Sequence, residues 1–216
     1  MPSEASPRAG LRSSLGLAPG RVVVGALASR HDSAGLTLLV QAFRRFGPGY
    51  AVLVVIGSRS CRHMFRQIAR GLPGIHFFEA DGGLEAMLPD LDLLVSASQE
   101  RGPATTLLNA MQVGLPIVAV DTPGARQLLA FSPATLVPGN DPDALGIAMQ
   151  ASIRGLRFPW GWSTRTRVCY DLSRHDRSLA VASIERFYRR LLTRSTGAHA
   201  ADHPDRLASP PGRQPF

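Results

Sequence analysis

The sequence contains no lysine, so all 24 of its basic side chains are arginines. It has only two cysteines, Cys61 and Cys169, which lie far apart and belong to no CxxC pair or Cys/His set with zinc-site spacing. A disulfide framework and a zinc site therefore have no support. No apolar run approaches the roughly 20 residues of a membrane-spanning helix, and residues 1–20 lack the apolar centre of a signal peptide. We expect a cytoplasmic protein that needs no metal or other cofactor.

The formal net charge of +8 is concentrated in the last third of the chain. Residues 151–216 contain twelve Arg against five Asp plus Glu, a net of +7, so the preceding residues are close to neutral. Excess positive charge can indicate contact with nucleic acid, anionic lipid or an anionic substrate. No aromatic residues alternate with these arginines and no nucleic-acid motif precedes them, which favours a solvated arginine-rich helix and tail without nucleic acid. Weak peripheral contact with an anionic membrane is the alternative.

Several catalytic signatures are also missing. The chain has no GxSxG, Walker loop, HExxH or GxGxxG, so hydrolase, P-loop, zinc-protease and dinucleotide-binding functions lack their usual signals. Its six histidines are scattered, and His31 is the one that best fits a position in a ligand-binding loop. A lone surface histidine is nevertheless more often structural.

What the sequence does contain is an alternation of short apolar runs with longer amphipathic segments. Six strands are predicted, at residues 21–27, 51–57, 74–78, 91–98, 116–120 and 134–138. Helices are predicted at residues 36–46, 61–70, 105–113, 125–131, 143–154 and 175–192. This pattern indicates an α/β domain over residues 21–193, with a Rossmann-like parallel sheet flanked by helices on both faces. Residues 1–20 and 194–216 are rich in small and polar residues, and we expect them to be disordered.

Local signals mark two of the helix boundaries. Asp141 precedes Pro142 as a helix N-cap ahead of a first-turn proline. Gly114 follows Val113 and is predicted to end the helix there.

Residues 93–121, LLVSASQERGPATTLLNAMQVGLPIVAVD, resemble the donor-site segment of glycosyltransferase family 4, retaining enzymes of the two-domain GT-B fold. The shared elements are a strand ending in a small residue and Ser, a Gly-containing loop, a helix with Ala-Met, then Gly-Leu-Pro and a buried strand. Further matches occur in the same order at 22–43, 52–57, 119–129, 136–145 and in the closing segment that ends ERFYRRLL. The resemblance covers residues 21–192. It implies a single C-terminal half of a GT-B enzyme, the half that binds the nucleotide sugar.

The resemblance implies a retaining hexosyltransferase, which moves a sugar from a nucleotide-sugar donor to an acceptor that the sequence does not identify. Without an N-terminal domain the cleft would be incomplete, so we expect weakened activity, a truncated or split gene, or a separate N-terminal domain partner. The alternative is a non-catalytic remnant or binding module of the same fold. A sugar-nucleotide epimerase-like domain shares the architecture, but it needs acids and bases that cannot be placed.

Charged groups that the resemblance assigns to the donor site are replaced here. The family's pyrophosphate-binding Arg and Lys fall at Ala26 and Ala34, and Arg30 between them is a candidate substitute. The family's two glutamates fall at Arg101 and Asn109. Asn109 can still exchange hydrogen bonds with a ribose, whereas Arg101 cannot accept one. These four replacements motivate the non-catalytic alternative.

The start of the helix in this segment keeps features that suit a phosphate. Gly102 and Pro103 form a permissive turn and helix start, followed by two hydroxyls. An ordinary proline-initiated helix explains the same residues equally well. The donor-binding candidates are Gly25, Arg30, Ser58, Arg59, Glu79, Glu100, Arg101, Gly102, Pro103, Thr105, Thr106 and Asn109, where Glu100 would replace a family glutamate after a loop shift and Ser58, Arg59 and Glu79 would lie near the base. No catalytic residue can be assigned.

Overall fold

The computed structural model describes residues 10–18, 20–29, 31–46, 49, 51–79, 87–99, 104–156 and 168–175. The chain divides into two compact units, residues 1–171 and 172–216. Within the second unit the described part is a short 3-10 turn, η3 (Ser173–His175). The helix predicted for residues 175–192 and the tail at 194–216 otherwise lie outside the described residues.

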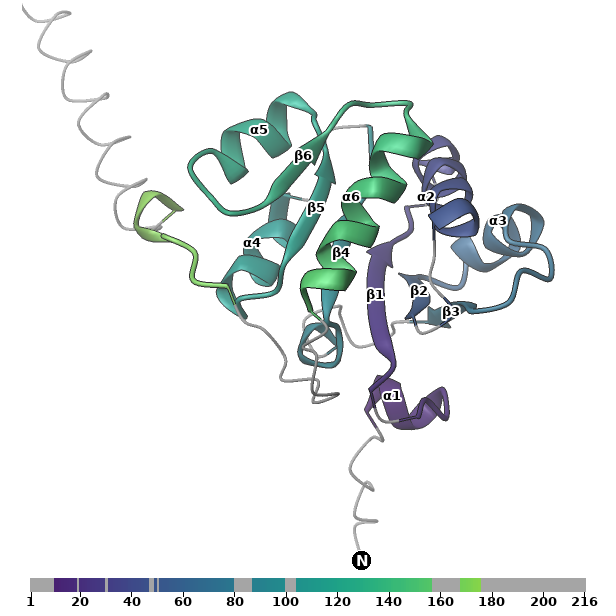
Figure 1. Ribbon diagram of the computed structural model, residues 1–216. Coiled ribbons are helices and arrows are strands. Elements are labelled where there is room, and N and C mark those ends of the chain that lie inside the picture. Colours follow the sequence, from purple (N-terminus) through teal and green to yellow (C-terminus); the bar gives the residue numbers. More distant parts are fainter. Residues whose placement is uncertain are drawn as a thin grey trace, which may run out of the picture. The chain divides into compact units, whose positions relative to one another are not determined.

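The first unit is built on one six-stranded parallel sheet in the order β3-β2-β1-β4-β5-β6 (Figure 1). All six predicted strands are confirmed, with ends that differ by up to two residues. Their bounds are β1 Val22–Leu27, β2 Ala51–Gly57, β3 Ile75–Glu79, β4 Leu93–Ser96, β5 Ile117–Val120 and β6 Thr135–Val137. The central strands are apolar throughout because helices cover both of their faces, and every residue of β2 and β5 is buried.

Helices lie on both faces of this sheet, as predicted for the fold class. They are α2 (Ser33–Phe46), α3 (Cys61–Ile68), α4 (Ala104–Gln112), α5 (Pro123–Leu129) and α6 (Pro142–Gly155), with a 3-10 turn η2 (Leu88–Asp90) before β4. One apolar cluster joins α2, α3 and α6 to alternate residues of the strands. Right-handed crossovers place α4 and α5 on the opposite face.

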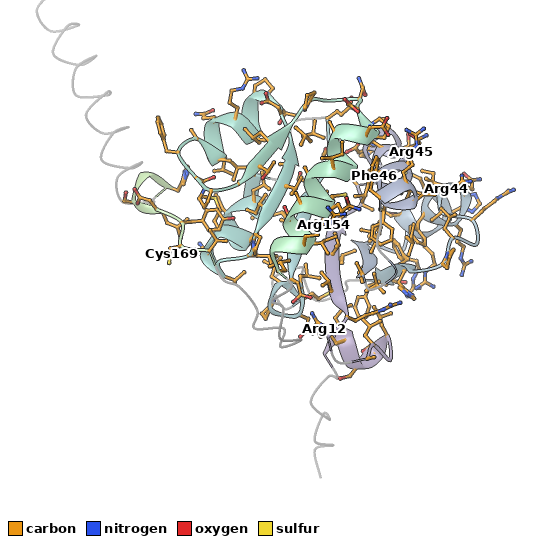
Figure 2. All side chains as sticks on the ribbon, in the orientation of Figure 1. Arg12, Arg44, Arg45, Phe46, Arg154 and Cys169 are labelled. Carbon is orange, nitrogen blue, oxygen red and sulfur yellow. The ribbon has the colours of Figure 1, made fainter. Side chains whose placement is uncertain are left out.

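Close packing of α2 against α6 depends on a glycine. Phe46 lies at the end of α2 (Figure 2), and its ring occupies the space that a side chain at Gly146 of α6 would need. An exposed ion pair between Arg45 Nη1 and Asp143 Oδ1, 2.5 Å apart, joins the same two helices. Glycine at residue 146 therefore sets how closely α6 approaches α2.

The predicted helix boundaries are confirmed at both marked positions. Asp141 Oδ1 accepts hydrogen bonds from the backbone N–H groups of Asp143 and Ala144, at 3.0 and 2.9 Å. Gly114 follows α4 with φ of 68°, a left-handed conformation that glycine adopts without strain. Helix α2 starts three residues earlier than predicted, at Ser33, because Asp32 caps it.

Part of the segment expected to be disordered is folded. Residues Leu11–Ser14 form a short helix, α1, and Leu11 is buried. Arg12 anchors this helix by an ion pair with Asp92 and by a bond from its Nε to the carbonyl of Asp90, 3.0 Å long. The departure from the expected disorder arises because the anchoring carboxylate lies 80 residues away in the sequence.

The last residues of the first unit also return to the sheet. The backbone N–H of Val168 donates to the carbonyl of Gly114 at 2.7 Å, and the Tyr170 hydroxyl donates to the carbonyl of Leu115 at 2.9 Å. Both carbonyls lie just before β5. Cys169 between these two contacts is exposed (Figure 2), whereas Cys61 is buried, and both are free thiols.

Candidate functional site

The six parallel strands end at one edge of the sheet, the carboxyl edge (Figure 1). Strand order reverses direction between β1 and β4, because β1 continues through α2 to β2 on one side while β4 leads to β5 on the other. Ligands of open parallel sheets bind beyond the carboxyl ends of the strands at such a reversal. The loops after β1, β2, β3 and β4 therefore form the candidate site.

Helix α2 begins directly at this reversal. The Asp32 carboxylate is buried and accepts a hydrogen bond from the N–H of Gly35 at 2.8 Å. A Cβ on Gly35 would lie 2.7 Å from the Ala97 carbonyl oxygen and 2.6 Å from Asp32 Oδ2. Glycine is required there because the first turn of α2 presses against the end of β4.

The loop after β2 is held beside the loop after β1. A Cβ on Gly57 would lie 3.2 Å from the Ala28 Cβ, and Cys61 Sγ lies 3.5 Å from the Ala28 carbonyl oxygen. Ser58, a predicted base-side residue, shares a hydrogen bond of 2.7 Å with the hydroxyl of Ser60. The start of α3 thus brings hydroxyl groups to the site.

Two arginines enclose the predicted residue Glu79 at the end of β3. Arg59 Nε donates to Glu79 Oε1 at 2.9 Å, and Arg62 Nη2 donates to Oε2. The hydrogen bond from Arg59 is the main cause that lowers the pKa of Glu79, and the positive charge of Arg62 adds to it while desolvation opposes it. One carboxylate against two guanidinium groups leaves this corner of the edge with a net positive charge.

Arg59 and Glu79 were predicted together as neighbours of the base, and the structure brings them into contact. Arg62, which also lies over the Phe77 ring at 5.9 Å from its centroid, was missed. A gap of 17 residues separates it from Glu79, and no local motif joins the two. The sequence signal that could have found Arg62 is its position in the first turn of the helix that follows a predicted strand.

Helix α4 carries three further described candidates. Thr105 is exposed, Thr106 is buried and Asn109 is half-buried. Thr105 and Asn109 are four residues apart, so they share one face of the helix. The other candidates near this helix start, Glu100, Arg101, Gly102 and Pro103, lie outside the described residues, as does Arg30 after β1.

Gly25 has a packing role in the structure. It lies inside β1, paired with Val54 and Leu94, and a Cβ there would overlap the side chain of Leu91. This packing alone accounts for the glycine. Its contact with a donor stays a prediction.

The two alanines at cation positions of the family differ in their surroundings. Ala26 is 1% exposed within the apolar cluster on the α2 face of the sheet, where an arginine would have to bury its charge. Ala34 is exposed at the start of α2 and lines a pocket of about 300 Å³ with Ser33, Thr37 and Asn140. A cation could be accommodated at residue 34 and not at residue 26.

Two further side-chain pairs at the carboxyl edge were not predicted. Gln99 after β4 donates to Asn140 after β6, and Asn140 has a left-handed φ of 61°. Arg126 makes two bonds to Asp121 at the end of β5, of 2.9 and 2.6 Å, which lower the pKa of Asp121 and raise that of Arg126. The first pair joins loops 41 residues apart in the sequence, so only the strand order reveals it, whereas the second pair is local, with partners five residues apart.

Within the described ranges, no three His, Cys, Asp or Glu side chains form a group that would hold a metal ion. In the same ranges, no helix combines the length and apolar character needed to cross a bilayer. Most arginines of residues 151–216 lie outside the described part. Donor binding without a metal and peripheral membrane contact both stay predictions.

A sequence profile of the family Glycosyl transferases group 1 matches residues 18–154, more than half of the chain. The chain belongs to this family. A search of curated protein sequences gave no match. The matched residues run from just before β1 to the last turn of α6, so they include every strand of the sheet.

Solved structures similar to this chain are GT-B glycosyltransferases. HepE from Anabaena, in complex with UDP and glucose, is 22% identical with a TM-score of 0.56, over 66% of this chain and 41% of HepE. WaaG, a glycosyltransferase of lipopolysaccharide biosynthesis, is 19% identical with a TM-score of 0.58, over 71% of this chain and 44% of WaaG. The C-terminal domain of LpcC from Francisella tularensis is 18% identical with a TM-score of 0.52, over 69% of this chain and 83% of that domain. The chain thus spans less than half of the two longer proteins and has the fold of a GT-B C-terminal domain.

Proposed function

We propose that this domain binds a nucleotide sugar at the carboxyl edge of its sheet and donates the sugar to an acceptor of a class still to be found. The observation that carries the proposal is the position of Ser58, Arg59 and Glu79 after β2 and at the end of β3, on the carboxyl edge and on the β1 side of the strand reversal, in a chain of the glycosyl transferase group 1 family. The UDP and UDP-glucose bound by HepE support a nucleotide-sugar ligand. No metal or cofactor is part of the proposal.

Each group in the proposed site has a chemical role. The hydroxyl of Thr105 and the first backbone N–H groups of α4 offer donors to a diphosphate. The Asn109 side chain offers a donor and an acceptor to the ribose hydroxyls. Arg59 and Arg62, which share one carboxylate, supply positive charge that the alanines at residues 26 and 34 do not.

Transfer itself would need a second domain to close the cleft over the donor, because glycosyl transfer depends on orientation and exclusion of water. We propose a separate N-terminal domain partner and a cytoplasmic location, to which the two free thiols are suited. A non-catalytic binding module is the second candidate. The observation that favours it is Ala26, which stands at a family cation position and lies in the apolar cluster.

Ligand-induced stabilisation tests the donor site. The purified chain is titrated with UDP, GDP and ADP and with their glucose conjugates, and the rise in melting temperature is followed, because binding to the native state stabilises it by mass action. We expect one base to stabilise the chain. Arg62→Gln should weaken this binding roughly tenfold, the effect of one charge-assisted interaction. Arg45→Gln, a matched change at an exposed ion pair on α2, should leave it unchanged.

The two candidate functions give different results in a turnover assay. Release of nucleotide from the stabilising sugar conjugate, alone or with an added N-terminal domain, would rule out the non-catalytic module. Binding without release under both conditions would favour it. If none of these ligands stabilises the chain, the donor site is contradicted in both forms of the proposal.

A further inference from the structure

A second pocket lies at the opposite edge of the sheet, where β1, β2 and β3 begin. It has a volume of about 300 Å³ and is lined from three sides. Phe43 and Arg44 come from the last turn of α2, and Arg21 precedes β1. Leu72 and Pro73 come from the turn between α3 and β3, and Ile75 is the first residue of β3. None of the groups assigned to the donor site lines this pocket.

The wall of the pocket is apolar. Phe43 is buried in the main apolar cluster, and Leu72 and Ile75 are half-buried against that cluster. Gly74 in the same turn has a φ of 75°, and a Cβ there would meet Phe43 Cε1 at 4.0 Å, so the turn lies against the ring. Such a wall stabilises an apolar group that is removed from water.

The charged side chains that line the pocket are both positive. Arg21 donates to the carbonyl of Gly49, which holds its guanidinium at the rim, and Arg44 is exposed beside it. Among the described residues neither arginine has a carboxylate partner, and none of the described lining residues is acidic. Arg45, the next residue on α2, is paired with Asp143.

We propose that this pocket binds a small molecule that carries a phosphate or carboxylate on a compact apolar group. Guanidinium groups bind both anions through paired hydrogen bonds, and the apolar wall accepts the remainder of the molecule. The volume is at the lower end of the range for small-molecule sites, so the ligand is small. This site is independent of the nucleotide-sugar site, because the two lie at opposite edges of the sheet.

The test uses phenyl phosphate and benzoate as probes, followed through the amide NMR signals of the full chain. We expect saturable shifts at Ala51, Gly74 and Ile75 with at least one probe, and none at Thr105. Inorganic phosphate and benzyl alcohol each supply half of the proposed ligand, and both should bind at least about tenfold more weakly than the better probe. UDP at saturation should leave the probe's affinity unchanged.

Variants of two adjacent arginines complete the test. Arg44→Gln should weaken the better probe roughly tenfold and Arg44→Glu further, since each removes a charge-assisted contact. Arg45→Gln should change the affinity by less than about twofold, because its partner is Asp143. The proposal is overturned if neither probe shifts the three signals, if inorganic phosphate binds as well as the probes, if UDP competes, or if the two glutamine variants behave alike.

Discussion

Arg12 in α1 forms an ion pair with the buried carboxylate of Asp92, which lies just before β4. The same carboxylate oxygen accepts a hydrogen bond from the N–H of Val23 in β1, at 2.8 Å. The guanidinium also donates to the carbonyl of Arg21 at 2.9 Å. One buried charge therefore ties the N-terminal helix to two neighbouring strands.

Removal of the Arg12 side chain should destabilise the domain. Arg12→Ala leaves Asp92 buried with its charge uncompensated, and we expect a loss of about 2–3 kcal/mol in the free energy of unfolding. Urea denaturation at neutral pH measures the loss. Arg45→Ala, at an exposed pair, is the control and should cost less than about 0.5 kcal/mol. Equal effects of the two variants would contradict the anchoring role of Arg12.

Substitution by alanine at two glycines of α6 should have opposite effects on the stability of the domain. Gly146→Ala forces the new Cβ into the Phe46 ring, and overpacking of this kind costs about 1–3 kcal/mol. Gly155→Ala has no atom within 4 Å of the new Cβ, so helix propensity should stabilise the domain by up to about 1 kcal/mol. Thermal unfolding of both variants provides the comparison, and a stable Gly146→Ala protein would show that α6 can move away from α2.

Glu79 should contribute stability at neutral pH that is lost in acid. Its pKa in the folded chain is lowered from 4.5, mainly by the hydrogen bond from Arg59, so the folded state holds the proton less tightly than the unfolded state. The contribution is present above the unfolded pKa and disappears as the pH falls through the lower, folded value. Glu79→Gln should thus be less stable than the parent at pH near 7 and approach it in acid; urea midpoints measured across this range check the trend.

Ionisation of Tyr170 should destabilise the domain in strong alkali. Burial raises its pKa from 10 to about 12, so the folded state favours the neutral phenol. The contribution is complete below pH 10 and is lost as the pH rises through about 12. Ultraviolet absorbance should detect one late-titrating tyrosine in the parent that Tyr170→Phe lacks. The same variant loses the bond to the Leu115 carbonyl, and we expect it to cost about 1 kcal/mol near neutral pH.

The fold could be predicted because its signals are local. Continuous apolar runs such as that of β2, a capping Asp141 and a terminating Gly114 each act within a few residues of their position in the sequence. The α1 helix could not be predicted in this way. Four residues are too few for a helical period, and their anchor, Asp92, is close only after the sheet has formed.

The candidate site was predictable in part, for the same reason. Ser58, Arg59 and Glu79 follow predicted strands, so their presence at one edge follows from a parallel sheet. The pairing of Glu79 with Arg62, and of Gln99 with Asn140, depends on which strands are neighbours. Gly25 was a candidate for contact with the donor, but the structure gives a packing reason for it. A Cβ at this position would overlap the side chain of Leu91.

The contacts of Val168 and Tyr170 with the carbonyls of Gly114 and Leu115 bear on how this domain should be trimmed for experiments. The family match ends at residue 154, and a truncation placed there would strip two hydrogen bonds from the entrance to β5. A shortened chain that keeps residues through Asp171, the end of the first compact unit, retains them. The C-terminal boundary for expression should therefore be placed after Val168 and Tyr170, beyond the end of α6.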